Sequence, residues 1–150
     1  MATWIGNKAF ANHPVPGAVE SVMSALGDLS KLPGLRSADG GIRREDVLVA
    51  LASRCQAAGL VPTPDAHTDG SDPTHRIGLR VEAGRAHTNN DGLLAVLEAA
   101  ANPDVDVLVL VVPAFYKGSV TADRVEQRIR WAFSSPGIEV ALTGVALLSY

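Results

Sequence analysis

The run "DVDVLVLVVP", residues 104–113, constrains the fold more than any other part of the sequence. Its centre is continuously apolar and rich in the β-branched residue valine. A strand of this composition is typically buried on both faces, as in the middle of a parallel sheet. Parallel neighbours need long crossover connections, which are usually helices. The run therefore predicts a central strand in a sheet that is covered on both faces.

The segments on either side of this run supply the expected neighbours. Residues 76–86, "RIGLRVEAGRA", alternate apolar and polar side chains, which predicts a strand with one apolar face. Residues 88–103 and 121–135 each begin with a helix N-cap signal, and residues 137–150 predict a final strand. The order strand, helix, strand, helix, strand predicts an α/β fold, a three-layer α/β sandwich with a mixed, largely parallel central sheet. In the helix within 88–103 the apolar residues are Leu93, Leu94, Leu97 and Ala101.

The first half of the chain is less regular. Residues 1–16 contain two prolines and no clear period, which predicts an irregular N-terminal arm before a single domain over 17–150. Helices are expected within 17–29 and 43–59. Residues 60–63 predict an edge strand, because prolines at 62, 64 and 73 argue against a long regular strand here. An exposed loop is expected to follow up to residue 75.

Composition excludes several classes of protein. A hydrophobic fraction of 47% and a charged fraction of 19% over 150 residues are typical of one globular domain. A net charge of −3 argues against a general nucleic-acid coat, but it leaves room for a local basic groove. The longest apolar run is too short to span a bilayer, and no signal-peptide pattern is present, so we expect a cytoplasmic protein. The preference for arginine over lysine is typical of GC-rich bacterial genomes.

The strand within 76–86 carries the most suggestive polar residues. Glu82 and Arg80 lie on its polar face, and the predicted helix that follows adds free N–H groups at its start. In an open α/β sheet, ligands gather at the carboxyl ends of strands. A charge on a covered face must be paired or coordinated. An Arg80–Glu82 ion pair would meet that requirement without catalysis, and this alternative stays open.

The residues "IGLRVEAGRAHTNNDGLLAVLEAAANPDVDVLVLVVP", 77–113, resemble a branch of the restriction-endonuclease-like PD-(D/E)XK nuclease superfamily. In that branch a core strand leads through an Asn-containing turn and a helix to an apolar strand ending in proline. The resemblance extends over the chain from Asp65 onward, about half of it. It implies a restriction-endonuclease-like core and Mg²⁺-dependent hydrolysis of DNA phosphodiesters, in which the metal polarises the phosphate and generates hydroxide.

The resemblance also implies site residues, in two alternative frames. In the family, acids on two successive strands bind Mg²⁺, and a lysine or second acid two positions after the latter helps to activate water. In one frame Glu82 takes that last position and Arg80 takes the position of the metal-binding acid, although arginine cannot bind a cation. In the other frame Glu82 is the metal-binding acid and Arg85 is the nearest base.

The first acid of the motif has two candidates, Asp65 and Asp72. The expected catalytic residues are therefore Asp65, Arg80, Glu82 and Arg85, and the expected Mg²⁺ ligands are Asp65, Asp72 and Glu82. Other acids and histidines between residues 65 and 87, including His67, Asp69 and His75, are interpreted as parts of a solvated loop. Lys117, after the apolar strand, is interpreted as an exposed loop lysine or as an anion-binding group.

Two functions follow from these observations. The first is a divergent nuclease-like domain, active or catalytically silent, that binds or cleaves DNA with Mg²⁺. The alternative is a non-enzymatic α/β interaction or assembly protein. In that case the terminal strand, if it is a sheet edge, would pair with a protein partner or with a second copy of the chain. The N-terminal arm would be a second surface for a protein partner.

Overall fold

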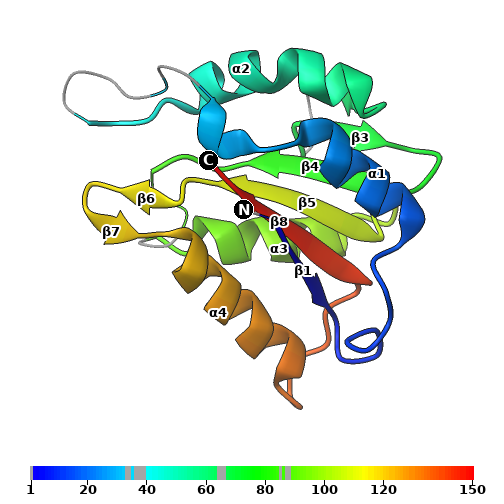
Figure 1. Ribbon diagram of the computed structural model, residues 1–150. Coiled ribbons are helices and arrows are strands. Elements are labelled where there is room, and N and C mark those ends of the chain that lie inside the picture. The colour runs from blue at the N-terminus through cyan, green and yellow to red at the C-terminus, as the bar shows by residue number, and fades with distance from the viewer. Residues whose placement is uncertain (1, 33–34, 36–39, 64–66, 85, 87–88) are drawn as a thin grey trace.

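The computed structural model describes residues 2–32, 35, 40–63, 67–84, 86 and 89–150 (Figure 1). This part of the chain is a mixed α/β fold with a six-stranded mixed sheet and four α-helices. Its elements in chain order are β1 (Ala2–Gly6), α1 (Gly17–Leu26), a 3₁₀ turn (Leu29–Lys31), α2 (Arg44–Ala57), β2 (Val61–Pro62), β3 (Gly70–Asp72), β4 (Ile77–Val81), α3 (Asp91–Ala101), β5 (Val107–Val112), β6 (Phe115–Tyr116), β7 (Ser119–Val120), α4 (Ala122–Ser134) and β8 (Gly144–Ser149).

The sheet is built around β5. The strand order is β1-β8-β5-β4-β3-β2, with β4, β5 and β8 parallel to one another. β1 and β3 run antiparallel to their neighbours β8 and β4, and β2 runs antiparallel to β3. Every residue of β5 is buried. The predicted central strand and the predicted order of strands and helices in the second half are therefore confirmed.

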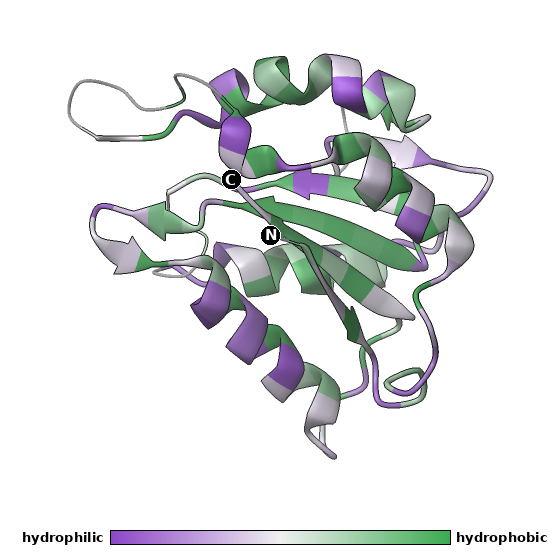
Figure 2. Ribbon diagram, viewed as in Figure 1, coloured by the Kyte–Doolittle hydropathy of each residue, from purple (hydrophilic) through white to green (hydrophobic). Residues whose placement is uncertain are grey.

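Helices pack on both faces of the sheet, α1 and α2 on one and α3 and α4 on the other (Figure 1). Hydropathy follows this arrangement, because the central strand β5 is apolar throughout while much of α4 is polar (Figure 2). The first face joins Val19, Val22, Leu26, Val47 and Leu51 to Leu79, Val109, Val111, Ala146 and Leu148. The second joins Ala95, Val96, Val125, Ile129 and Phe133 to Leu108, Leu110, Val145 and Leu147.

The alternation of β4 decides where its charges lie. Ile77, Leu79 and Val81 pack in the core under α1 and α2. Because neighbouring side chains of a strand point to opposite faces, Arg80 is directed to the face that α3 covers. This outcome matches the period-2 pattern of the sequence.

Among the described residues, none of the helices combines the length and the apolar character needed to cross a bilayer.

The N-terminal segment differs from its prediction. Residues 2–6 are not part of an irregular arm but form β1, which pairs with the other end of the chain, Ala2 opposite Leu148. Its residues, Ala-Thr-Trp-Ile-Gly, do not alternate strictly between apolar and polar, and its partner is distant in sequence. As a consequence β8 lies between β1 and β5, so the terminal strand is not a sheet edge.

Helix α3 packs through its small residues rather than through its leucines. Gly92, Ala95, Val96 and Ala99 are buried, whereas Leu94 and Leu97 are 50% and 46% exposed. The helix is apolar on most of its circumference, so spacing alone does not identify the side that meets the sheet. The small residues let α3 approach its neighbours closely, and a side chain at 92 would meet Val125 of α4.

Two short pairings interrupt segments that were predicted as loops. β3 lies within the expected loop, and β6 and β7 form a separate two-stranded hairpin after β5. The residues of β3, Gly-Ser-Asp, have low strand propensity. Its pairing with β2 and β4 determines its conformation, and local sequence does not report that pairing.

We expect Gly144→Ala to lower the free energy of unfolding by about 1–3 kcal/mol through overpacking. A Cβ at this position would lie 2.5 Å from the Trp4 ring and 2.7 Å from the carbonyl oxygen of Ile5, where β1 meets β8. Gly137→Ala is the matched control, since a Cβ there meets no atom within 4 Å. Urea denaturation of both variants measures the difference. Equal stabilities would contradict the close approach of β1.

Candidate functional site at the carboxyl end of the sheet

The parallel strands β4, β5 and β8 finish together at Val81, Val112 and Ser149, a region that we call the carboxyl end of the sheet. Helices α3 and α4 begin at this end because they follow β4 and β5. Helix α2 begins there too, since Nε of its first residue, Arg44, donates to the carbonyl of Val81, 2.8 Å away. Three helix N-termini therefore contribute positive potential to one region.

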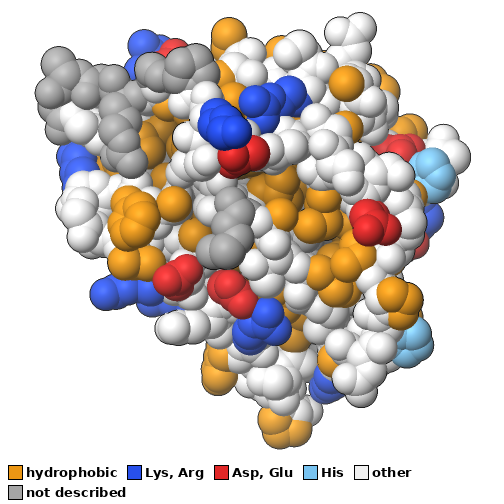
Figure 3. Space-filling view, in the orientation of Figure 1, with side chains coloured by type: hydrophobic (Ala, Val, Ile, Leu, Met, Phe, Trp, Pro, Cys, Tyr) orange, Lys and Arg blue, Asp and Glu red, His pale blue; other side chains and the backbone are white. Residues whose placement is uncertain are grey.

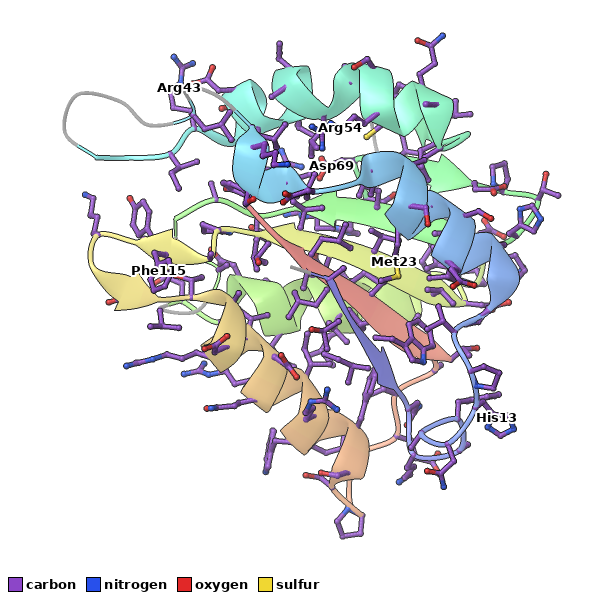
Figure 4. All side chains as sticks on the ribbon, in the orientation of Figure 1. His13, Met23, Arg43, Arg54, Asp69 and Phe115 are labelled. Atoms are coloured by element: carbon purple, nitrogen blue, oxygen red, sulfur yellow. The ribbon has the colours of Figure 1, made fainter. Side chains whose placement is uncertain are left out.

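Asp69 and Arg44 complete the hydrogen bonding of β4. β3 begins at Gly70, opposite Leu79, so β4 extends beyond its neighbour and leaves the backbone of Val81 without a strand partner on that side. The Val81 N–H donates to Oδ2 of Asp69 at 2.7 Å, and the other Asp69 oxygen pairs with the Arg44 guanidinium. The Asp69 side chain is only 8% exposed and lies between α2 and the sheet (Figure 4).

Arg80 and Glu82 form a second ion pair on the neighbouring face. Nε of Arg80 donates to Oε1 of Glu82 at 2.7 Å, and Nη1 of Arg80 donates to the carbonyl of His67 at 3.1 Å. The Glu82 backbone is held by Val111 and by the hydroxyl of Tyr150. The Glu82 side chain is 9% exposed and the Arg80 side chain 23%.

The two ion pairs interact, and we call Arg44, Asp69, Arg80 and Glu82 the charge cluster. Burial raises the pKa of Glu82, although the hydrogen bond and charge of Arg80 act in the opposite direction. The charge of Arg44 also acts to lower the Glu82 pKa, and that of Asp91 to raise it. Burial and the neighbouring positive charge of Arg80 lower the pKa of Arg44, but a guanidinium stays charged. The cluster therefore couples two buried carboxylates to two cations.

The structure separates Asp72 from Glu82. Asp72 pairs with Ile77 at the start of β4, whereas Glu82 follows its end, which puts the two about 16 Å apart along the strand. The Asp72 carboxylate instead accepts hydrogen bonds from the backbone of Thr74 and from the backbone and ring of His75. One cation cannot contact both acids. Asp65 and Arg85 lie outside the described residues.

The acid that contacts the end of β4 is Asp69, which the sequence analysis assigned to a loop. Because β3 and β4 are antiparallel, the residue before β3 is adjacent to the residues that end β4. The carboxylate of Asp69 contacts Val81, the immediate neighbour of Glu82. Assignment of Gly70–Asp72 as a strand antiparallel to β4 would have predicted the contact between Asp69 and Val81. The polar sequence Gly-Ser-Asp does not indicate a strand.

The described residues do not fit the Mg²⁺ site that the resemblance implies. Each of the two neighbouring carboxylates already accepts hydrogen bonds from an arginine. In the described part of the chain, no group of three or more His, Cys, Asp or Glu side chains is arranged to hold a metal ion. A cation would have to displace both guanidinium groups. The exposed parts of the arginines and the helix N-termini instead suit an anion.

The hairpin of β6 and β7 lies against the loop that follows β4. The ring of Tyr116 packs on Gly84, where a Cβ would overlap the ring. Lys117 adopts a φ of 47° at the hairpin turn, and its ammonium lies 5.5 Å from the Tyr116 ring. The exposed lysine therefore lies beside Tyr116, whose ring packs on Gly84 in the loop that follows β4.

Comparison of the chain with protein-family models, with curated proteins and with solved structures finds no match. The resemblance of residues 77–113 to the nuclease superfamily stays a prediction. The functional argument therefore rests on the geometry of the charge cluster and of the β6–β7 hairpin.

We expect the stability of the wild-type protein, relative to Glu82→Gln, to fall as pH rises through the raised pKa of Glu82. The folded state holds this proton more tightly than the unfolded state, whose pKa is near 4.5. The proton on Glu82 therefore stabilises the folded state at pH values below the unfolded-state pKa. This stabilisation is lost as the pH rises through the folded-state pKa. Urea denaturation of both proteins over a series of pH values measures the difference. A constant difference, or one that grows with pH, would contradict a buried carboxylate.

Proposed function

We propose that this chain is a divergent restriction-endonuclease-like domain, a three-layer α/β sandwich, that binds the phosphodiester backbone of DNA without metal-dependent cleavage. The observation that carries the proposal is the charge cluster at the carboxyl end of the sheet, where arginines hold both neighbouring acids. In this proposal the two acids correspond to the acids of a nuclease site, and the arginines bind phosphate and prevent the acids from binding a metal.

The positions of the acids support the nuclease-like part of the proposal. Asp69 directly precedes β3 and Glu82 directly follows β4, and these strands are hydrogen-bonded neighbours. The resemblance implies acids on two successive strands that converge on one site. Asp69 fills the first of these positions better than Asp72, because its carboxylate contacts the backbone next to Glu82.

The arginines support binding rather than hydrolysis. Arg80 occupies the position where the resemblance implies a metal-binding acid, and it donates a hydrogen bond to Glu82. Arg44 does the same for Asp69. A guanidinium is neither a metal ligand nor a general base at physiological pH. Both acids are thereby occupied, and no residue of the charge cluster is left to activate a water molecule.

Phosphate is the ligand that this end of the molecule suits. The side chains of Arg44 and Arg80 are 33% and 23% exposed, so part of each guanidinium fork reaches solvent. Such forks bind phosphate oxygens through two parallel hydrogen bonds. Basic and acidic side chains are interspersed on the visible face of the molecule (Figure 3), so we expect the affinity for DNA to be moderate. Because the contacts are to phosphates, this affinity should fall as the salt concentration rises.

A protein-binding domain is the second candidate. It is favoured by an apolar groove between α3 and α4, with a volume of about 560 Å³, lined in part by Leu93, Leu94, Leu97 and Trp131. The terminal strand does not serve this role, because β8 pairs on both sides. The DNA-binding measurement separates the two candidates.

We expect the wild-type protein to bind labelled DNA at low salt and Arg80→Gln to bind it more weakly. Loss of one phosphate contact should reduce the slope of log affinity against log salt by about 1. Arg130→Gln is the matched control, because Arg130 makes the same type of Nε–Oε1 pair, with Glu126 on α4. Fluorescence anisotropy over a salt series measures both quantities. A wild-type protein that binds no DNA at low salt would overturn the proposal.

The same preparations test cleavage. Plasmid and single-stranded DNA incubated with Mg²⁺ or Mn²⁺ should show no more cleavage with the wild-type protein than with Glu82→Gln. Metal-dependent cleavage by the wild type that disappears in Glu82→Gln would show an active enzyme and contradict the non-cleaving part of the proposal.

Arg80→Glu should create affinity for a divalent cation. The substitution removes the guanidinium from Glu82 and introduces a second carboxylate on the same strand face, which Mg²⁺ or Mn²⁺ accepts as a ligand. Without metal the two carboxylates repel, so we expect a lower unfolding temperature that rises with Mn²⁺ concentration. Thermal unfolding with and without Mn²⁺ measures this, beside Arg130→Glu as control. Equal metal responses of both variants would contradict the assigned role of Arg80.

A further inference from the structure

The groove between α3 and α4 gathers large apolar side chains that the fold leaves exposed. Leu94 and Leu97 of α3 are about half exposed, and Trp131 of α4 is 59% exposed. All three line this one groove, whose volume is about 560 Å³. Helix α3 buries its small residues against the rest of the protein instead. Large apolar side chains that gather on one surface are typical of a site that another molecule covers.

The charge of the groove is positive. Arg128 of α4 lines it one turn before Trp131, and the Arg128 side chain is exposed. Among the described residues, no acidic side chain forms an ion pair with Arg128. The other polar residues of the described lining, Asn89 and Asn90, are uncharged. A carboxylate on the occupant would therefore complement the groove, whereas an ammonium group would be repelled.

The shape of the groove favours a helix as its occupant. Its walls are α3 and α4, which pack against each other and both begin at the carboxyl end of the sheet. The backbone groups of a helical wall are used within the helix, so an extended peptide finds no strand edge to pair with here. The half-exposed leucines also show that the groove is open, unlike a cavity that encloses a small molecule. An amphipathic helix needs only an apolar surface of this kind.

We infer that this groove binds an amphipathic helix of a partner protein, with the apolar side of that helix on Leu94, Leu97 and Trp131 and one of its carboxylates on Arg128. The inference goes beyond DNA binding, because no residue of the charge cluster lines the groove. It names the chemistry of the partner for the second candidate function. A second copy of this chain is the other occupant, and the test identifies it.

The experiment uses two labelled peptides of about four helical turns. The first has leucines at i, i+3, i+4 and i+7 and glutamates beside them, and the second has lysine in place of each glutamate. The wild-type protein should bind the glutamate peptide about tenfold more tightly, as measured by fluorescence anisotropy at low salt. The net charge of −3 opposes this preference, so the preference would come from the groove. Equal affinities, or tighter binding of the lysine peptide, would overturn the inference.

Arg128→Glu should reverse the preference, so that the lysine peptide binds more tightly than the glutamate peptide. Arg130→Glu is the matched control, because Arg130 lies on the same helix but does not line the groove. The control should prefer the glutamate peptide as the wild type does. A preference that both substitutions reverse, or that neither changes, would overturn the pairing of Arg128 with the carboxylate.

Leu97→Gln and Trp131→Ala should each weaken binding of the glutamate peptide about tenfold, because each removes apolar surface from the groove. Val49→Gln is the control, since Val49 is 77% exposed on α2, which covers the opposite face of the sheet. Unchanged affinity in both groove variants would contradict the inference. Far-UV circular dichroism and thermal unfolding identify any variant that misfolds, and Arg128→Glu, which changes an exposed side chain, then carries the test.

Sedimentation velocity of the wild-type protein tests the second copy, and we expect a monomer. A dimer that dissociates in Leu97→Gln but not in Val49→Gln would assign the groove to self-association and overturn the partner helix. Wild-type protein that binds neither peptide would also overturn the inference, and would leave DNA binding at the charge cluster intact. Protein that binds the glutamate peptide but no DNA would overturn the proposed function and support the inference.

Discussion

The structure depends on the burial of β5 on both of its faces. A strand with no polar face needs parallel or antiparallel neighbours on each side and helices above and below it, and β4, β8 and the four helices meet that need. Parallel pairing of β4, β5 and β8 then forces α3 and α4 to start where the strands end. The positive helix termini and the charged side chains gather at one end of the sheet for this reason.

At that end, a difference in strand length produces the site. β4 continues past the start of β3, and the buried backbone of Val81, which has no strand partner on that side, requires polar partners. Asp69 and Arg44 provide them, while Arg80 neutralises Glu82 one residue further along. The same contacts that stabilise the end of β4 thus occupy both acids with arginine. This double role is the basis on which we propose a site that binds an anion rather than Mg²⁺.

The predictions held where the pattern was local and strong. The continuous apolar run of β5, the alternation of β4 and the cap signals of α3 and α4 each correspond to an observed element. They failed where structure depends on distant pairing. β1 and β3 are short strands, of which β3 has weak propensity, and they are placed by pairing with β8 and β4. Asp69 was assigned to a loop for the same reason, since it contacts the end of β4 only because β3 and β4 are antiparallel.

By itself the sequence determined the α/β class, the central strand, the crossover helices and the presence of Glu82 and Arg80 on one strand face. These depend on periodicity and on the cost of burying charge, both of which are written in neighbouring residues. Only the tertiary structure decided which acid contacts the end of β4, which arginine holds each acid, and that the terminal strand is interior. Each of these outcomes depends on strand order and register, which arise from contacts between segments far apart in the chain.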